Sequence, residues 1–384
     1  MKILHVTPYF YGAWAYGGIP RLSYALAQAQ AELGHEVHVV TTDVKDARTR
    51  QKKAPEISGM EVRVYSNFSN YTAYHYQFFF PLKLGVEKKR AGQYDVVHLH
   101  GHRNLLNTRM AAYACQAGVP TVLQPNGTLV NIERRQAVKK VYDVIWGQRQ
   151  VEKTDAFVAV SEAEVSQIMA AGVPAEKISV FPNGVDMDID DGGRSFKKEY
   201  GIKDDYVLYL GKITPRKGIE HAIAALALMQ RKDVLLVVAG NDMGHEKELM
   251  RIAANHSVAD RVLFTGLLTG ALKAAAYREA RYTVYAGKDE IFGLVPWESL
   301  LCGTPVIVAD DSGCGEWIHK AGAGYVVPYG DAKTIADIID NGELAEEEIM
   351  VARGREFCRD NLSWSSIAEG MIEYYREVRK WRMS

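Results

Sequence analysis

Short apolar runs alternate with amphipathic helical stretches along nearly the whole chain, and this alternation restricts the fold more than any other feature. A parallel strand that is buried on both faces reads as a continuous apolar run, and the helix that follows it covers the sheet. The pattern therefore predicts an α/β protein built on parallel sheets. In the first half we predict strands at Ile3–Val6, Val37–Thr41, Val62–Tyr65, Val96–Leu99, Thr121–Gln124, Ala156–Val160 and Ile178–Phe181. In the second half we predict them at Val207–Leu210, Leu235–Ala239, Val262–Thr265, Thr283–Ala286, Pro305–Val308 and Gly324–Val327.

Both halves open in the same way, with a strand, a glycine-bearing turn and a helix. In the first half Thr7 leads to Gly17 and Gly18, and in the second half Gly211 leads to Lys217 and a further glycine. Doubly wound sheets bind their ligands at the carboxyl ends of the strands, where such turns lie. We therefore expect a ligand-binding edge in each half.

The length of 384 residues exceeds that of one typical core and indicates two domains. The turn Pro182–Asp186 is followed by the polar stretch 187–194, so we place the boundary there. The predicted domains are residues 1–184 and 185–363. A long helical stretch from Trp364 to Trp381 lies in the remaining segment, residues 364–384.

Composition excludes several classes of protein. A hydrophobic fraction of 47% with 24% charged residues is typical of a globular protein, and the net charge of −1 argues against a nucleic-acid binder. The 4 cysteines lack C-x-x-C spacing, which indicates a reducing compartment and no metal site. The apolar run Met1–Val6 soon meets Pro8 and reads as a strand, not as a signal peptide. Because no run approaches the roughly 18 apolar residues of a membrane span, we expect a cytoplasmic protein.

Glu290 and Glu298 bracket a glycine turn. If a helix starts near Gly293 or Leu294, Glu290 lies in the preceding loop and Glu298 lies about one turn inside. The free backbone N–H groups of Phe292, Gly293 and Leu294 then form a positive helix end that suits phosphate. Carboxylates nearby accept hydrogen bonds from sugar hydroxyls. Together these groups predict a site for a nucleotide-sugar.

Two glutamates at this spacing are also compatible with an ordinary solvated helix, but their neighbours favour a site. The strand Thr304–Val308 and the small-residue loop Asp311–Glu316 follow directly. With these neighbours the run resembles the E-x7-E signature of retaining glycosyltransferases of family 4. That family has the GT-B fold, in which two Rossmann-like domains face each other across an interdomain cleft. In this fold the last helix crosses back onto the first domain, so the resemblance implies that residues 364–384 return to the N-terminal domain. The resemblance extends over almost the whole chain.

The resemblance assigns roles in the second half. It implies that Glu298 holds the ribose hydroxyls of the donor and that Glu290 lies near the donor hexose. It also implies that Lys212 and Lys217 stabilise the leaving diphosphate, whose charge grows in the transition state. Lys212 stands where the family usually has arginine, so it keeps the charge but loses the bidentate fork. Arg216 reads as a solvated loop residue.

In the first half, Gly17 and Gly18 resemble the flexible family loop that approaches the donor phosphate and the acceptor. His98 and His100 point to the same face of their strand, because side chains alternate with a period of two. Both are compatible with hydrogen-bonded core residues. The resemblance favours His100, at the carboxyl end of the strand, as the histidine that contacts the donor sugar.

Other loop residues stay open between two roles. His102 fits an acceptor contact, and Asn126 either binds a hydroxyl or shapes the turn. Gly313 and Gly315 either let a sugar or phosphate approach the backbone or simply form turns. The D-x-D spacings within 186–190 follow the boundary turn and read as linker. The aromatic segment 71–80 is either core or an exposed surface for an acceptor or a membrane.

Arg134, Arg135, Lys139 and Lys140 form a basic cluster, and a second one contains Lys83, Lys88, Lys89 and Arg90. Such clusters are commonly solvated helix faces. In this family a basic face of the first domain can also contact anionic lipid and receive a lipid-linked acceptor. The predicted location therefore includes the inner face of the membrane.

The implied activity is transfer of a hexosyl group from UDP- or GDP-hexose to an acceptor hydroxyl, with retention of configuration and without metal or cofactor. The donor binds the second domain and a glycan or lipid-linked acceptor binds the first, which is typical of glycan, polysaccharide or glycolipid biosynthesis. Two alternatives remain, a sugar-nucleotide 2-epimerase and a catalytically inactive binding partner. A nicotinamide dehydrogenase is disfavoured, because no G-x-G-x-x-G follows the first strand.

Overall fold

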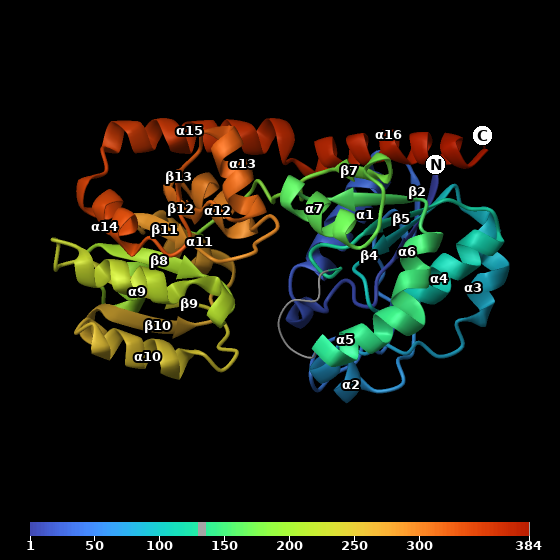
Figure 1. Ribbon diagram of the computed structural model, residues 1–384, viewed down its shortest axis with the longest axis horizontal. Helices are drawn as coiled ribbons and strands as arrows, with labels where there is room; N and C mark the ends of the chain where they lie inside the picture. The colour runs from blue at the N-terminus through green and yellow to red at the C-terminus, as the bar shows by residue number, and fades with distance from the viewer. Residues whose placement is uncertain (130–135, 384) are drawn as a thin grey trace. The chain divides into compact units, whose positions relative to one another are not determined.

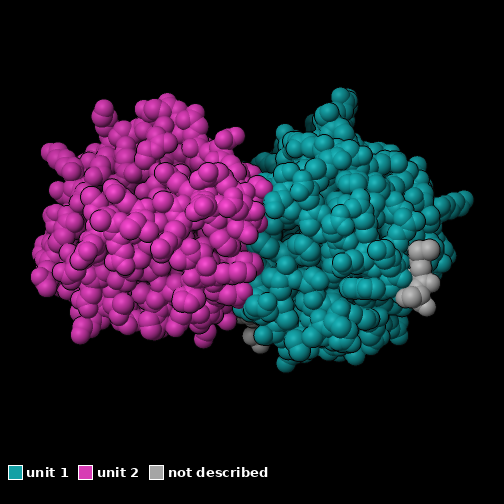
Figure 2. All heavy atoms as spheres, turned by 90° about the horizontal axis from the view of Figure 1, so that it is seen from above, with its two compact units in different colours: residues 1–184, 364–384 teal, residues 185–363 magenta. Residues whose placement is uncertain are grey.

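The computed structural model describes residues 1–129 and 136–383, and its secondary structure follows the alternation of the sequence (Figure 1). The chain divides into two compact units, coloured separately in Figure 2. Unit 1 comprises residues 1–184 and 364–384, and unit 2 comprises residues 185–363. The paired strands of both sheets run parallel, so each unit gathers the carboxyl ends of its strands at one edge.

Unit 1 contains a seven-stranded sheet in the order β3-β2-β1-β4-β5-β6-β7, with β1 and β4 adjacent at its centre. The strands are β1 (Lys2–Val6), β2 (Glu36–Thr42), β3 (Met60–Tyr65), β4 (Val96–His100), β5 (Thr121–Gln124), β6 (Ala156–Ala159) and β7 (Ile178–Val180). The order reverses between β1 and β4, and this reversal marks the switch point at which α/β sheets bind ligands.

The helices of unit 1 are α1 (Ile19–Glu32), α2 (Asn70–Tyr76), α3 (Gly85–Arg90), α4 (Leu105–Gln116), α5 (Gln136–Tyr142), α6 (Gln148–Lys153), α7 (Glu162–Ala170) and α16 (Trp364–Met383). A π-helical turn, η3 (Asp143–Gly147), joins α5 to α6. Side-chain caps determine where several of these helices begin. The Asn104 side chain accepts from the Asn107 N–H at the start of α4, and Ser161 does the same for Glu164 at α7.

The C-terminal helix α16 belongs to unit 1 and packs against α1 (Figure 1). Its buried residues join Ile3, Leu26 and Val96 in one apolar cluster, which contains Ile367, Ala368, Met371, Ile372, Tyr374, Tyr375 and Val378. Where the chain leaves unit 1, a Cβ on Gly184 would overlap the ring of Trp364. The helix is therefore part of the unit 1 core although it is the last element of the chain.

Unit 2 contains a six-stranded sheet in the order β10-β9-β8-β11-β12-β13, with its own switch point between β8 and β11. The strands are β8 (Tyr206–Leu210), β9 (Leu235–Ala239), β10 (Val262–Gly266), β11 (Tyr282–Tyr285), β12 (Val306–Ala309) and β13 (Tyr325–Val327). The helices are α8 (Phe196–Tyr200), α9 (Ile219–Leu228), α10 (Glu246–Asn255), α11 (Gly270–Arg278), α12 (Leu294–Cys302), α13 (Gly313–Ala321), α14 (Ala332–Asn341) and α15 (Leu344–Asn361).

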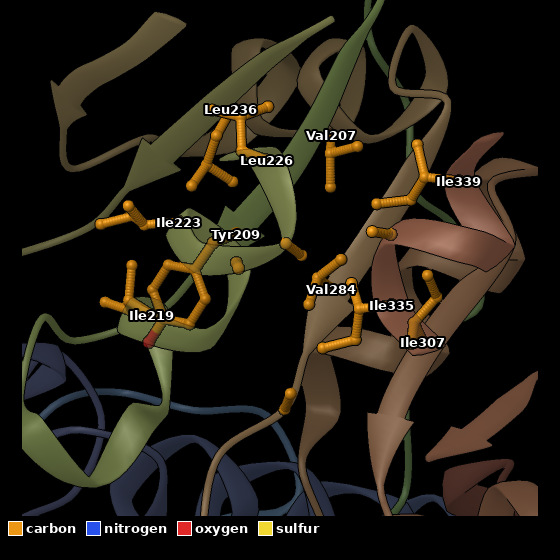
Figure 3. Packing of buried hydrophobic residues seen from close by; sticks show 14 of the residues in the cluster. Val207, Tyr209, Ile219, Ile223, Leu226, Leu236, Val284, Ile307, Ile335 and Ile339 are labelled. Carbon is orange, nitrogen blue, oxygen red and sulfur yellow. The ribbon is translucent and has the colours of Figure 1, made fainter. Parts of the chain in front are cut away.

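The largest cluster of the unit 2 core lies between the sheet and two helices. Figure 3 shows α9 and α14 turning branched side chains toward the strands. The labelled residues of this cluster are Val207, Tyr209, Ile219, Ile223, Leu226, Leu236, Val284, Ile307, Ile335 and Ile339. Because such a core is close-packed, removing one branched side chain leaves a cavity.

The aromatic segment 71–80 divides between the two predicted roles. Phe79 is buried and packs with Tyr9 and Tyr16, whereas Tyr71 and Tyr76 on α2 are largely exposed. The four cysteines are free thiols. Among the helices of the described ranges, none combines the length and the apolar character that a membrane span requires.

Ile223→Ala tests the core of Figure 3. Ile223 is fully buried, so its truncation should lower the free energy of unfolding by about 2–5 kcal/mol. Leu228→Ala on the same helix is a matched control, because Leu228 is 58% exposed and its truncation should cost under about 0.5 kcal/mol. Urea unfolding of both variants measures the difference. Equal costs would contradict the packing of α9.

Candidate functional site

Two loops meet at the carboxyl edge of the unit 2 sheet. One follows β8 and contains the short 3₁₀ turn Pro215–Lys217, and the other follows β11. The Lys288 N–H donates to the carbonyl of Arg216 over 2.8 Å, and a Cβ on Gly218 would overlap the Ala286 carbonyl oxygen. Gly218 has φ +64°, in the left-handed region that glycine tolerates best. This backbone contact brings the two loops together.

Lys217 and Glu290 form a nearly buried ion pair in this contact. Lys217 Nζ lies 2.5 Å from Glu290 Oε1, and the side chains are only 13% and 10% exposed. The Tyr285 hydroxyl donates to Glu290 Oε2 over 2.9 Å and accepts from Lys217 Nζ over 3.0 Å. The Glu290 carboxylate thus holds the Lys217 ammonium group both directly and through the Tyr285 hydroxyl.

The Glu290 carboxylate stays ionised although it is buried, because positive charges lie beside it. Burial alone would raise the pKa of Glu290, but the positive charges of Lys217 and Arg216 outweigh it and hold the pKa below its usual value. Arg216 stands 3.6 Å from the carboxylate and also donates to the carbonyl of Asp289. Contrary to the expectation of a solvated loop residue, Arg216 is part of the network.

The N-terminus of α12 lies beside this network. Gly293 precedes the helix with φ +71°, and a Cβ there would lie 2.9 Å from Tyr285 Cε1 and 3.2 Å from Cys314 Sγ. Gly293 at the N-cap offers no capping side chain, and the first turn of α12, which the structure describes in full, carries no acidic residue. The positive helix end is therefore available to an anion. Phe292 is buried and packs on Trp297, so only its backbone can take part.

Glu298 lies in the second turn of α12, as the start at Leu294 requires, and has different partners from Glu290. It accepts from Lys273 Nζ over 2.7 Å and from the Tyr277 hydroxyl over 2.8 Å. Its side chain is 20% exposed. Lys273, Tyr277 and Tyr285 were not predicted, although the i, i+4 spacing of Lys273 and Tyr277 places both on one face of α11.

The remaining predicted residues of unit 2 lie at the same edge. Lys212 follows β8, and its carbonyl accepts from the Tyr209 hydroxyl over 2.9 Å. Gly313 and Gly315 begin α13, where the Ser312 side chain accepts from the Gly315 N–H. A Cβ on Gly315 would overlap the carbonyl oxygen of Ala309, so this glycine lets α13 approach β12 closely. Packing thus explains Gly315.

In unit 1 the two glycines after β1 differ. Gly17 has φ +111°, which favours glycine, and its N–H donates to the carbonyl of Trp14. Gly18 has an ordinary φ, precedes α1 and has open space where a Cβ would stand. No side chain caps α1 at Gly18. The backbone of Gly18 is therefore accessible at the start of this helix.

His100 ends β4 and is 1% exposed. Its Nε2 lies 2.9 Å from Nδ1 of His5, on the neighbouring strand β1. Burial and the neighbouring histidines lower the pKa of His100 well below its usual range, so its imidazole is neutral at pH 7. The Asn107 side chain donates to the carbonyls of His100 and Gly101, each over 2.8 Å. These bonds fix the turn after β4.

His102 and Asn126 lie in the loops after β4 and β5. The His102 N–H donates to Thr128 Oγ1 over 2.7 Å, which ties the two loops together. Asn126 has φ +50°, and among the described residues its buried amide atoms have no hydrogen-bond partner. Glu164, which the sequence reasoning missed, accepts from the Gly127 N–H over 2.6 Å. Burial raises the pKa of Glu164 to about 7.

Two family models divide nearly the whole chain between them. Residues 16–189 match the model of Glycosyltransferase Family 4, and residues 194–355 match that of Glycosyl transferases group 1. The chain belongs to the family 4 type of glycosyltransferases. This family 4 protein therefore has the predicted α/β fold of the GT-B class, with two Rossmann-like units.

Individual relatives agree with this assignment. The chain is 24% identical to an uncharacterised glycosyltransferase of Methanocaldococcus jannaschii, with 98% of both chains covered. It is 29% identical to a D-inositol 3-phosphate glycosyltransferase of Acidothermus cellulolyticus, over 76% of this chain and 68% of the relative.

Solved structures of similar fold cover the chain almost completely. HepE of Anabaena, in complex with UDP and glucose, superposes with a TM-score of 0.73 at 19% identity, over 98% of this chain and 100% of the other. Sucrose-phosphate synthase of Thermosynechococcus elongatus gives 0.72 at 20% identity, over 98% of both chains.

Lys217→Met tests the ion pair. The substitution leaves the Glu290 carboxylate buried beside Tyr285 without its main counter-charge, which should cost about 3–5 kcal/mol of unfolding free energy. The double variant Lys217→Met/Glu290→Gln should recover most of this loss, because it removes the uncompensated charge. Arg216→Met is the control, and we expect a cost under about 1 kcal/mol for this more exposed residue. Absence of any rescue in the double variant would contradict the pair.

Proposed function

We propose that this family 4 glycosyltransferase moves a hexosyl group from a nucleotide-hexose to an acceptor hydroxyl, with retention of configuration. The observation that carries the proposal is the Lys217–Glu290 pair beside the uncapped start of α12. A nucleoside diphosphate needs a fixed cation and free N–H groups, and this edge of unit 2 supplies both.

In this proposal different residues bind the different parts of the donor. Lys217 and Lys212 stabilise the diphosphate, which gains charge as it departs. The N–H groups of Phe292, Gly293 and Leu294 bind a phosphate oxygen at the start of α12.

The glutamates bind the donor sugars. Glu298 accepts the ribose hydroxyls, and Glu290 lies near the hexose while holding Lys217 in place. Lys273 and Tyr277 orient the Glu298 carboxylate through hydrogen bonds that leave it one-fifth exposed.

UDP-hexose is the first donor to test. HepE, of similar fold, is described in complex with UDP and glucose, which supports a uridine nucleotide. GDP-hexose stays as the second candidate. The proposed reaction needs no metal, because lysine side chains and a helix end supply the positive charge that the phosphates require.

Unit 1 binds the acceptor in this proposal. Gly17 and Gly18 belong to the loop that approaches the donor phosphate and the acceptor, and His100 contacts a hydroxyl of the donor sugar. The acceptor is a glycan or a lipid-linked saccharide, and the protein acts in the cytoplasm in glycan or polysaccharide biosynthesis. Retention follows from attack on the face that the phosphate leaves, with the phosphate taking the acceptor proton.

Product analysis separates this activity from its rivals. A retaining transferase releases nucleoside diphosphate together with a product whose new glycosidic bond has the same anomeric configuration as the donor. A 2-epimerase consumes the nucleotide-sugar without any acceptor, and an inactive partner consumes none.

Donor binding should stabilise the protein against heat. Thermal unfolding with UDP, GDP, ADP and their hexose conjugates, in the presence of a chelator, should show a raised Tm for one base, because a ligand that binds only the native state stabilises it. At a ligand concentration of about 100 times Kd the gain is roughly 2.7 kcal/mol. Glu298→Ala should remove most of the shift. A shift of equal size in this variant would contradict the ribose assignment.

We further propose that the π-helical turn of unit 1 and its flanking helices contact an anionic membrane. Val141, Val144 and Ile145 are 59%, 78% and 45% exposed and follow one another closely at the end of α5 and in η3. Exposed Lys140 and Arg149 flank this apolar group. Arg134 and Arg135, predicted to join the basic cluster, lie outside the described residues. Apolar residues beside cations suit the interface of an anionic bilayer.

Vesicles containing an anionic lipid test this surface. The wild type should bind them at moderate salt, and Val141→Ser/Val144→Ser should weaken binding about tenfold or more, because two exposed apolar side chains no longer enter the interface. Lys140→Glu should weaken binding to anionic vesicles alone. Leu228→Ser, which changes an equally exposed residue of unit 2, is the control. Lack of wild-type binding would refute the contact.

A further inference from the structure

Five buried side chains of unit 1 form a continuous chain of hydrogen bonds that ends at His100. They are His5 on β1, Gln30 on α1, Tyr375 on α16, and His98 and His100 on β4. Each is at most 1% exposed. Tyr375 and Gln30 are separated by 345 positions in the sequence, so the fold alone brings them together.

The chain can be followed atom by atom. His98 Nδ1 contacts the Tyr375 hydroxyl, which accepts from Gln30 Nε2 over 3.4 Å. Gln30 Oε1 lies 2.8 Å from His5 Nε2. His5 Nδ1 lies 2.9 Å from His100 Nε2.

The three imidazoles are neutral at pH 7. Burial lowers the pKa of His5 to about 4 and holds the pKa values of His98 and His100 well below their usual range. Each ring therefore carries a single N–H, and its two nitrogens have opposite roles, one donating and one accepting. Once one ring nitrogen is known to donate or to accept, the donor and acceptor roles of the other nitrogens along the hydrogen-bond chain follow.

Gln30 sets the direction. Its amide N–H donates to the Tyr375 hydroxyl, so its oxygen accepts from His5 Nε2, and His5 Nδ1 must accept in turn from His100 Nε2. At the other end the Tyr375 hydroxyl, which accepts from Gln30, donates its own proton to His98 Nδ1.

Two ring nitrogens of the chain, His98 Nε2 and His100 Nδ1, have no hydrogen-bond partner among the described residues. His100 carries its proton on Nε2, so its buried Nδ1 is an acceptor with a free lone pair. An unmet buried acceptor is costly, and it discriminates in favour of a ligand that brings an O–H. His100 lies at the carboxyl end of β4, where α/β sheets bind ligands.

We propose that Tyr375, Gln30 and His5 are positioning residues for His100, and that their hydrogen bonds hold its proton on Nε2 so that Nδ1 accepts the O–H of a sugar hydroxyl. The inference rests on the proposed function, in which the substrates are sugars. It makes the C-terminal helix α16 a part of the substrate-binding machinery, because Tyr375 is one link of the chain.

A metal ion explains the three histidines less well. Their nitrogens lie within 4.8 Å of one another, close enough for a shared ion. However, the rings of His98 and His100 stack with centroids 4.2 Å apart and planes inclined by 9°, so their lone pairs, which lie in the ring planes, run side by side. His5 Nδ1 and His100 Nε2 lie 2.9 Å apart and face each other at hydrogen-bond distance, so they do not converge on a shared ion.

Nitrogen-15 NMR of the full chain with labelled histidine tests the proposal directly, because the two tautomers have distinct nitrogen shifts. The His100 signals are assigned by their loss in His100→Gln. We expect wild-type His100 to be protonated on Nε2, and Tyr375→Phe to populate both tautomers because the chain is cut. Gln30→Met cuts the next link and carries the same expectation if Tyr375→Phe does not fold.

Tyr374→Phe is the matched control. Tyr374 is the adjacent residue of α16 and is also buried, but its hydroxyl donates to the carbonyls of Phe157 and Lys177 and is not part of the chain. The His100 tautomer and kcat/KM should stay at wild-type values in this variant. Tyr375→Phe should lower kcat/KM about tenfold, the factor expected from loss of one hydrogen bond.

Three results would overturn the proposal. They are a wild-type His100 protonated on Nδ1, an unchanged tautomer in both Tyr375→Phe and Gln30→Met, and binding of Zn²⁺ that His98→Asn abolishes. Failure of the proposed function would give a different experimental result. If the tautomers follow expectation but UDP-glucose and GDP-mannose leave the His100 Nδ1 shift unchanged and are not consumed, the hydrogen-bond chain stands and its role toward sugars is overturned.

Discussion

The parallel pairing of the two central strands in each sheet decides which polar side chains of this protein meet. In unit 1, β1 pairs with β4 so that His5 stands opposite His98, and His100 then lies within hydrogen-bond reach of His5. In unit 2, the pairing of β8 with β11 places their following loops in backbone contact, which brings Lys217 to Glu290. Residues distant in the sequence become neighbours because strand order reverses at these two positions.

Burial has opposite outcomes for the ionisation of the titratable side chains at the two edges. At the edge of unit 2 the Glu290 carboxylate stays ionised, because Lys217 and Arg216 compensate for its loss of water. In unit 1, no acidic group is among those that set the pKa values of His5, His98 and His100, and burial keeps these three imidazoles neutral. The Lys217–Glu290 pair therefore presents charges, whereas the three histidines present neutral donors and acceptors.

Sequence reasoning recovered the elements because their signals are local. Each predicted strand lies within a residue or two of an observed one, since a buried parallel strand is a short apolar run between turn residues. The sequence predicted a helix start near Gly293 or Leu294, and α12 begins at Leu294, after a glycine whose positive φ and close approach to Tyr285 leave no room for a side chain. Glu290 and Glu298 were chosen because helix geometry relates them to that start and because the run resembles the family signature.

The partners of those residues were beyond local reasoning. Lys273 and Tyr277 reach Glu298 from another helix, and nothing in their own surroundings points to a carboxylate on α12. Tyr375 is more distant still, because it joins His98 across 277 positions and reads in the sequence as an ordinary buried residue of an amphipathic helix. Tertiary contacts of this kind depend on how α16 packs on α1, which hydrophobic periodicity predicts only as a buried face.

The contrast between the two edges matches the chemistry of a nucleotide-sugar substrate. A diphosphate keeps its negative charge and is bound best by fixed cations and helix ends, and Glu290 holds Lys217 in position before any ligand arrives. A sugar hydroxyl is neutral, and an ionised partner in its place would favour anions or cations over it. A neutral imidazole with a defined proton instead accepts one O–H and rejects an analogue that lacks it, because its buried lone pair would then stay unpaired. In the role proposed for His100, burial without a counter-charge produces this selectivity, whereas at the proposed phosphate site it would be a defect.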